Sequence, residues 1–327
     1  MAEAAISRTT GDNLVENPSR TRIAIVGLGA IGGVIAGSLA AVAWHEVIAC
    51  VRSRIERLVV ERPEGTVEVS IRALTEPADA VSVDWVLLCT KAHQTSAVGP
   101  WLARLCGPQT RVAVLQNGIR HADRLAPLVG MATVVPTVVY YNGERLARGR
   151  VRFRHVTDHD LAVRDDADGR ALGELLAGTP MRVLRTADFD TLAWRKLLIN
   201  AVANPITALT LQRQAVFRRE DVQALCLSIL EEAAAAGRAD GARLAPDEAE
   251  RTLATLLTYP AEAGTSMLFD RLGGRPFEVE ALTGAVVAVG ERHQVPTPLN
   301  AMLLTLLRAI SEVSGRHSET DPSSNSI

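Results

Sequence analysis

The first half of the chain alternates short apolar runs, rich in β-branched residues, with stretches of helical periodicity. Five such runs lie between residues 21 and 140, and continuous apolar runs of this length are typical of strands buried on both faces. Helical segments between successive strands indicate a parallel sheet covered on both sides. The predicted strands are Arg22–Val26, Glu46–Val51, Trp85–Cys89, Arg111–Leu115 and Thr133–Tyr140.

Three later runs alternate apolar and polar positions more regularly. We expect them to extend or cap the same sheet. They are Val151–Arg154, Asp160–Val163 and Arg182–Leu184.

The pattern changes after Asp188, where helical periodicity continues with almost no strand signal. This change predicts a domain boundary near residue 187 and an all-helical second domain. The predicted helices are Thr191–Leu211, Asp221–Ala242, Pro246–Tyr259, Glu278–His293 and Pro298–Val313.

Both ends of the chain are polar and lack apolar periodicity, which predicts disordered tails over 1–20 and 314–327. The remaining length suits two domains, each large enough for its own core. We therefore expect an α/β domain over 21–187 and a helical domain over 188–313.

Composition narrows the classes of function. Hydrophobic residues make up 47% of the chain, charged residues 22%, and the formal net charge is −2, which argues against nucleic acid as the main partner. No apolar run is long enough to span a membrane and the first 20 residues lack a signal-peptide core, so we expect a soluble cytoplasmic protein. The four cysteines are widely spaced, which indicates neither a zinc site nor a disulfide framework.

A glycine motif follows the first predicted strand. Gly27, Gly29 and Gly32 have the G-x-G-x-x-G spacing and open a helix of small residues. The first glycine permits a tight turn, the second lets the backbone approach a pyrophosphate, and the third brings helix against strand. In this context the motif predicts a Rossmann-type dinucleotide-binding domain. The residues expected to face the cofactor are Gly27, Leu28, Gly29, Ala30, Ile31 and Gly32.

Arg52 ends the second predicted strand, twenty residues after Gly32. An acid at this position would accept from the ribose 2′-hydroxyl of NAD, whereas arginine suits the 2′-phosphate of NADP. The sequence therefore favours NADP.

The chain contains only two lysines, Lys91 and Lys196, against 33 arginines. Where positive charge alone suffices arginine serves as well, so a retained lysine marks a candidate proton donor or a compact cation in a tight pocket. Lys91 follows the third predicted strand and Asn117 the fourth, at the strand ends where doubly wound sheets bind ligands.

Lys196, Asn200 and Asn204 lie four residues apart on one predicted helix and share one stripe of its surface. Buried amides need hydrogen-bond partners, so this stripe suits a ligand better than an apolar core. Pro205 follows directly and is expected to kink or end the helix.

At these positions the sequence resembles the ketopantoate reductase family (2-dehydropantoate 2-reductase), over essentially all of 21–313. The block with the lysine and the two asparagines is more specific than the glycine motif, and 133–143 match only loosely. The matching segments are GLGAIGG at 27–33, TKAHQT at 90–95, QNG at 116–118, WRKLLINAVANPITAL at 194–209, and Ser266-Met267-Leu268 with Glu278 twelve residues on.

The resemblance implies reduction of the C2 ketone of ketopantoate by NADPH to give pantoate, a step towards pantothenate and coenzyme A. It also implies that Lys91, Gln94 and Asn117 lie near the cofactor and that Lys196 is the general acid. The residues it implies for substrate binding are Asn117, Asn200, Asn204, Ser266 and Glu278.

The chemistry agrees with what these residues can do. Hydride delivery places negative charge on the carbonyl oxygen, and the Lys196 ammonium can both stabilise that charge and supply a proton. Glu280 is a second acid beside Glu278, and the spacing from Ser266 favours Glu278.

Two other functions stay open. One is a reductase of another 2-keto acid with the same mechanism, since the motifs specify the 2-oxo-carboxylate more clearly than the rest of the substrate. The other is a non-catalytic NADP-binding regulator, although a sensor needs neither the lysine nor the polar stripe. By analogy alone, helical second domains of this kind often pair, so a homodimer is one option for the assembly.

Overall fold

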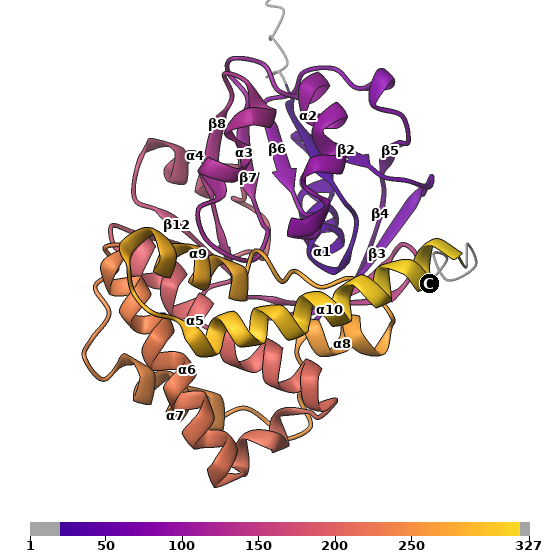
Figure 1. Cartoon of the computed structure of the whole chain (residues 1–327). Helices are drawn as coiled ribbons and strands as arrows, with labels where there is room; N and C mark the ends of the chain where they lie inside the picture. The colour runs from indigo at the N-terminus through magenta and orange to yellow at the C-terminus, as the bar shows by residue number, and fades with distance from the viewer. Residues whose placement is uncertain (1–19, 321–327) are drawn as a thin grey trace, which may run out of the picture.

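The computed structural model describes residues 20–320, with side chains up to 314. An N-terminal α/β part lies above a C-terminal group of helices, and the long helix α10 (Pro298–Thr320) crosses the molecule between them (Figure 1). None of the helices in this described part is long and apolar enough to cross a membrane.

The central sheet has six strands, and every neighbouring pair is parallel. Because β1 lies in the middle and the strand order reverses around it, the carboxyl ends of β1 and β6 meet at the switch point where doubly wound sheets bind ligands. The strands, in spatial order, are β5 (Arg72–Leu74), β2 (His45–Cys50), β1 (Thr21–Val26), β6 (Trp85–Leu88), β7 (Arg111–Val114) and β8 (Thr133–Pro136).

Alternate residues of β1 face opposite sides of the sheet. Ile23 and Ile25 are fully buried in the core that contains α1 (Ala30–Ala40), while Ala24 and Val26 are buried in the core beneath α2 (Gly99–Leu105) and α3 (His121–Val129). The predicted parallel sheet, apolar on both faces, is therefore confirmed.

The later strands do not extend this sheet, so that part of the prediction is wrong. They form two further sheets. One of these sheets includes a hairpin that was not predicted, and it packs on α1. One sheet has the order β10 (Asn142–Ala147), β11 (Arg150–Arg154), β3 (Arg57–Arg62), β4 (Gly65–Ser70). The other has the order β13 (Val183–Thr186), β12 (Leu161–Arg164), β9 (Val138–Val139), and α4 (Ala167–Leu175) packs against it.

The run predicted as one strand over Thr133–Tyr140 is two strands in two sheets. It leaves the central sheet at Pro136, which has no N–H to continue the ladder, and β9 then pairs with β12.

The C-terminal part is helical, as predicted. Its core gathers large side chains such as Trp194 and Phe217 together with many alanines, which allow close approach between helices. The helices are α5 (Phe189–Thr210), α6 (Glu220–Ala239), α7 (Glu248–Leu257), α8 (Ser266–Leu272), α9 (Thr283–His293) and α10.

The helix predicted over Thr191–Leu211 is α5, but the expectation that Pro205 ends it is wrong, and two other predicted limits are also wrong. α5 continues through Pro205 to Thr210, because burial of the segment around the proline outweighs the missing hydrogen bond. The helix predicted from Glu278 begins at Thr283, so Glu278 lies in the preceding loop. α10 continues past residue 313 to Thr320, since no proline interrupts it, while 1–19 and 321–327 of the predicted tails lie outside the described residues.

Candidate active site

The glycine loop after β1 has the geometry of a dinucleotide cradle. Gly27 has φ +96°, a value that favours glycine, and a Cβ on Gly32 would lie 1.8 Å from the Gly27 carbonyl oxygen. Gly29 is the N-cap of α1 and has open space where a Cβ would project, so a pyrophosphate can approach the free N–H groups of the helix. Leu28 is partly buried, and Ala30 and Ile31 begin α1.

The loop after β6 lies against this cradle. A Cβ on Gly27 would meet the Thr90 side chain at 2.8 Å, and Lys91 follows at the carboxyl end of the sheet. Gln94 lies one turn further on, partly buried, in the short helix Ala92–Gln94.

Lys91 connects the two parts of the molecule. Its Nζ is 2.9 Å from Asp270 Oδ2 on α8 and 3.3 Å from Glu278 Oε2 in the loop before α9. Glu278 also accepts from the backbone N–H of Ala92 at 2.9 Å and from Asn117 Nδ2 at 3.1 Å. The Glu278 carboxylate, only 5% exposed, is thus held by three donors of the α/β domain.

These contacts hold both groups charged. Burial alone would raise the pKa of Glu278, but the Lys91 charge and the hydrogen bonds outweigh it, so the pKa lies below its ordinary value. For Lys91 burial lowers the pKa, and the charges of Glu278 and Asp270 more than reverse this, so its pKa is raised.

Lys196 has different surroundings. It is partly buried on α5, its Nζ lies 5.1 Å from the centre of the Tyr140 ring, and among residues 20–320 it has no hydrogen-bond or ion-pair partner. Burial lowers its pKa to about 8, although the nearby charge of Glu278 acts in the opposite direction. The ammonium therefore keeps its hydrogen-bonding capacity for a ligand.

A small pocket lies beside this ammonium, between α5 and the ends of β7 and β9. Its lining combines an apolar wall with amide groups from both domains, which suits a small polar molecule. The lining includes Gln116, Asn117, Val138, Lys196, Leu197 and Asn200.

The two asparagines of α5 continue into α8. Asn204 Nδ2 donates to Asn200 Oδ1 at 3.2 Å, while its own Oδ1 accepts from Ser266 Oγ and from the Met267 N–H, each at 3.3 Å. Asn204 is buried and satisfied by this chain, whereas Asn200 lines the pocket and Ser266 is exposed.

The structure thus brings five of the predicted site residues together where the domains meet: Lys91, Asn117, Lys196, Asn200 and Glu278. Asn204 is hydrogen-bonded to Asn200, and Ser266 to Asn204. Arg52 is separate from this group and lies exposed in the loop after β2. Glu280 lies on the surface, in an ion pair with Arg308.

Sequence reasoning missed Asp270 and Tyr140. Asp270 is 5% exposed and pairs with both Lys91 and Arg275, and its signal was its place one helical turn after Ser266. It was missed because α8, only seven residues long, was not predicted. Tyr140 was counted as part of a strand.

Comparisons with known proteins agree with this arrangement. The family model for ketopantoate reductase PanE/ApbA matches residues 23–165, and the model for its C-terminal domain matches 188–311. The chain is 39% identical over 289 residues to 2-dehydropantoate 2-reductase of Caulobacter vibrioides, covering 88% of this chain and 99% of that protein. It is 36% identical over 304 residues to the enzyme of the same name from Mycobacterium tuberculosis, covering 90% and 99%.

Among solved structures, a dimeric ketopantoate reductase from Staphylococcus aureus superposes with a TM-score of 0.79 at 26% identity, covering 90% of this chain and 100% of that one. Family models that together span most of the folded chain, and relatives above 30% identity over nearly their whole length, lead to one conclusion. The chain belongs to the ketopantoate reductase family of dinucleotide-dependent reductases.

Proposed function

We propose that this protein reduces ketopantoate to pantoate with NADPH. The observation that carries the proposal is the Lys196 ammonium, unpaired among the described residues, with a lowered pKa, beside a pocket lined by Asn117 and Asn200. A general acid needs a pKa near the working pH and access to the atom that it protonates. Membership of the ketopantoate reductase family supplies the substrate class, a small 2-keto acid.

The residues that line the pocket have different roles in this proposal. Bound NADPH supplies the hydride. Lys196 donates a hydrogen bond to the ketone oxygen, stabilises the negative charge that develops there and delivers the proton that completes the alcohol. Asn117 and Asn200 hold the substrate's carboxylate and hydroxyl groups, while Asn204 donates to Asn200 and itself accepts from Ser266.

Glu278 has two tasks in this proposal. Its carboxylate is held in place by Lys91, Ala92 and Asn117, so it fixes the distance between the domains. Its negative charge also favours the protonated form of Lys196. Without that charge, burial would lower the pKa of Lys196 further and leave less of the acid form at neutral pH.

The cofactor preference for NADP rests on Arg52 and the absence of an acid at the end of β2. The glycine cradle fits the pyrophosphate that NAD and NADP share. A cytoplasmic homodimer completes the proposal; the dimer is suggested by the similar dimeric reductase from Staphylococcus aureus.

The test is to follow NADPH oxidation by absorbance with ketopantoate and with a panel of other 2-keto acids. We expect ketopantoate to have the highest kcat/KM and pantoate to be the product. Much higher kcat/KM for another 2-keto acid would replace the substrate but keep the reaction. No oxidation with any of them, despite tight NADPH binding, would favour a non-catalytic regulator.

A further inference from the structure

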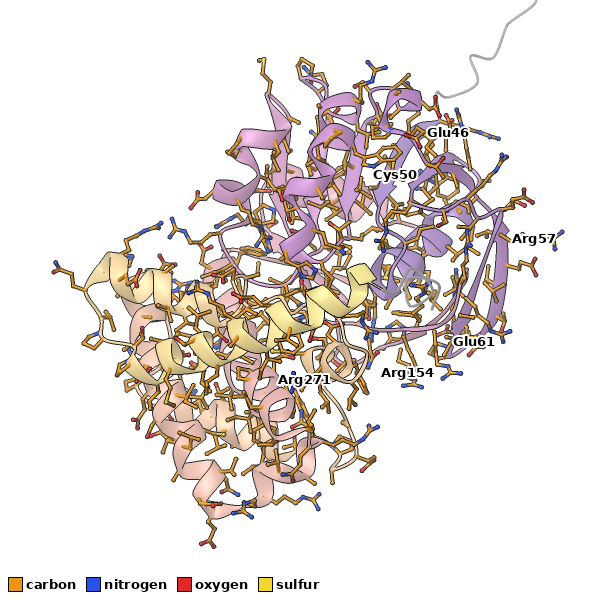
Figure 2. The ribbon with its side chains drawn as sticks, turned by 45° about the vertical axis from the view of Figure 1, so that its right-hand side comes forward. Glu46, Cys50, Arg57, Glu61, Arg154 and Arg271 are labelled. Atoms are coloured by element: carbon orange, nitrogen blue, oxygen red, sulfur yellow. The ribbon has the colours of Figure 1, made fainter. Side chains whose placement is uncertain are left out.

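The four-stranded sheet beside the cofactor cradle is rich in arginine, and several of these arginines form ion pairs. Figure 2 shows Arg57, Glu61 and Arg154 on this side of the molecule, with Arg57 pointing away from it. These side chains are mutually neutralised and need no ligand to explain them. The pairs are Arg57–Glu68, Arg150–Glu61, Arg152–Glu61, Arg152–Glu144 and Arg154–Glu144.

Arg148 behaves differently. It lies in the turn between β10 and β11, is exposed, and forms no ion pair with any residue in the described range. Its Nη2 instead donates to the backbone carbonyl of Arg54 at 2.6 Å, ninety-four residues earlier in the chain. One donor of the guanidinium is used in this way, and the others are available.

The turn that carries Arg148 packs against the start of β3, which directly follows the loop after β2. Gly149 has φ +71°, its carbonyl accepts from the Val59 N–H at 2.8 Å, and a Cβ at this position would lie 2.9 Å from the Arg57 carbonyl oxygen. A larger residue could not occupy this position, so the backbone fixes Arg148 beside the loop.

That loop contains Arg52, two residues before the carbonyl that Arg148 contacts. It starts at the carboxyl end of β2, where the Cys50 carbonyl accepts from the N–H of Gly27 at 3.1 Å. The loop therefore borders the glycine cradle, on the side where Rossmann domains receive the ribose of the adenosine. Arg52 is exposed and, like Arg148, has no ion-pair partner in the described residues.

We propose that Arg148 joins Arg52 in binding the 2′-phosphate of NADP and so helps to determine the cofactor preference. The inference rests on the proposed function, because it concerns the cofactor of that reaction. A phosphate monoester carries nearly two negative charges and three acceptor oxygens, more than one guanidinium can satisfy. Arg52 lies in the loop after β2, and a hydrogen bond to the Arg54 carbonyl holds Arg148 against the same loop, so the two arginines together can supply these donors.

Binding measurements on the whole protein test this. Dissociation constants for NADPH, NADH and 2′,5′-ADP are determined by calorimetry for the wild type and for Arg148→Gln, which keeps a polar side chain but has no charge. We expect Arg148→Gln to weaken NADPH and 2′,5′-ADP by about five- to thirtyfold, as for loss of a charge-assisted hydrogen bond, and to change NADH less than twofold.

Three other variants calibrate the result. Arg52→Ala should show the same selectivity for NADPH. Arg148→Lys, which keeps the charge but loses the two-pronged donor geometry, should fall between Arg148→Gln and the wild type. Arg57→Gln removes an equal charge from a nearby but ion-paired position, and should leave all three constants unchanged.

The outcomes separate the two proposals. A wild type that binds NADH as tightly as NADPH would refute the NADP preference and this inference together. A wild type that prefers NADPH, with Arg148→Gln unchanged, would overturn only the role of Arg148. Equal weakening of NADPH and NADH by Arg148→Gln would also overturn it, because Arg148 would then serve the loop and not the phosphate.

Discussion

The loop after β6 and the inward face of α5 each carry one of the two lysines of this chain, and their surroundings are opposite. Lys91 is paired with two buried carboxylates, and its pKa is raised. Lys196 has no such partner within residues 20–320, and burial lowers its pKa to about 8. The same side chain is therefore an ion-paired cation in one region and, among the described residues, an unpaired ammonium in the other.

The hydrogen bonds of Glu278 explain how Lys91 can be paired and Lys196 unpaired although the charge of this carboxylate acts on both. Its oxygens are taken up by Lys91, Ala92 and Asn117, so it acts on Lys196 through space and not by a hydrogen bond. If Glu278 were free to pair with Lys196, the ammonium would be neutralised and less available to a substrate. The ion pair with Lys91 thus keeps Glu278 from pairing with Lys196.

The largest expected effect is that of Lys196→Arg. The charge is kept, but a guanidinium cannot release a proton near neutral pH and is larger and planar. We expect kcat for ketopantoate to fall by about 10²–10⁴-fold, the usual contribution of general acid catalysis. NADPH affinity, which belongs to the other domain, should change little. Steady-state kinetics would contradict the assignment if kcat stayed near normal.

A pair of methionine variants tests the opposite roles through stability. Breaking a buried ion pair costs about 3–5 kcal/mol, and because the Lys91 side chain is 38% exposed we expect Lys91→Met to lose about 2 kcal/mol of unfolding free energy. Lys196→Met removes a desolvated charge that has no partner to lose, so its stability should stay within about 1 kcal/mol of wild type. Urea unfolding at pH 7 measures both.

The loss in Lys91→Met should depend on pH. The raised pKa of Lys91 gives a contribution that is present at neutral pH and lost only as pH rises through that pKa. The lowered pKa of Glu278 gives a second contribution to the unfolding free energy, which is lost as pH falls through that pKa. In the variant, Glu278 loses the charge of Lys91 that helps to lower its pKa and protonates more readily, so the difference from wild type should shrink towards pH 4. A difference that is independent of pH would contradict the ion-pair explanation.

The pH profile of catalysis also distinguishes the two lysines. In the proposed reaction, ketone reduction uses the protonated form of Lys196, whose pKa is about 8, so kcat/KM should be level below that pH and fall about tenfold per unit above it. Lys91, with its raised pKa, stays charged over this range and cannot produce the fall. A wild-type profile that is level up to pH 10 would exclude Lys196 as the titrating acid.

Much of this arrangement could be predicted from the sequence because it depends on local pattern. The strand–glycine–helix segment at 21–40 and the stripe of Lys196, Asn200 and Asn204 need only the chain's own periodicity, and both lie on the elements expected. The rarity of lysine also pointed to both ammonium groups. It did not reveal that one is paired and the other is not, since the partners are about 180 residues from Lys91 in sequence.

The features that could not be predicted from the sequence depend on tertiary contacts. The β3–β4 hairpin is half exposed and rich in charge, and it is a sheet only because β11 and α1 cover it. α8 is too short to show helical periodicity, so Asp270 was invisible as a partner of Lys91. Pro205 carried a local signal to end α5, which packing overrides.

The smallest expected effect is that of Glu280→Gln. Glu280 is two residues from Glu278, but its carboxylate is exposed and paired with Arg308 on α10, 2.7 Å from Nε. Exposed pairs contribute about 0–1 kcal/mol, so Glu280→Gln should keep kcat/KM within about twofold of wild type and lower stability by less than about 1 kcal/mol. Glu278→Gln removes the charge that faces both lysines and should lose far more activity. If the two variants were equally active, or if Glu280→Gln were the weaker enzyme, the carboxylate that acts on Lys196 would have been assigned to the wrong residue.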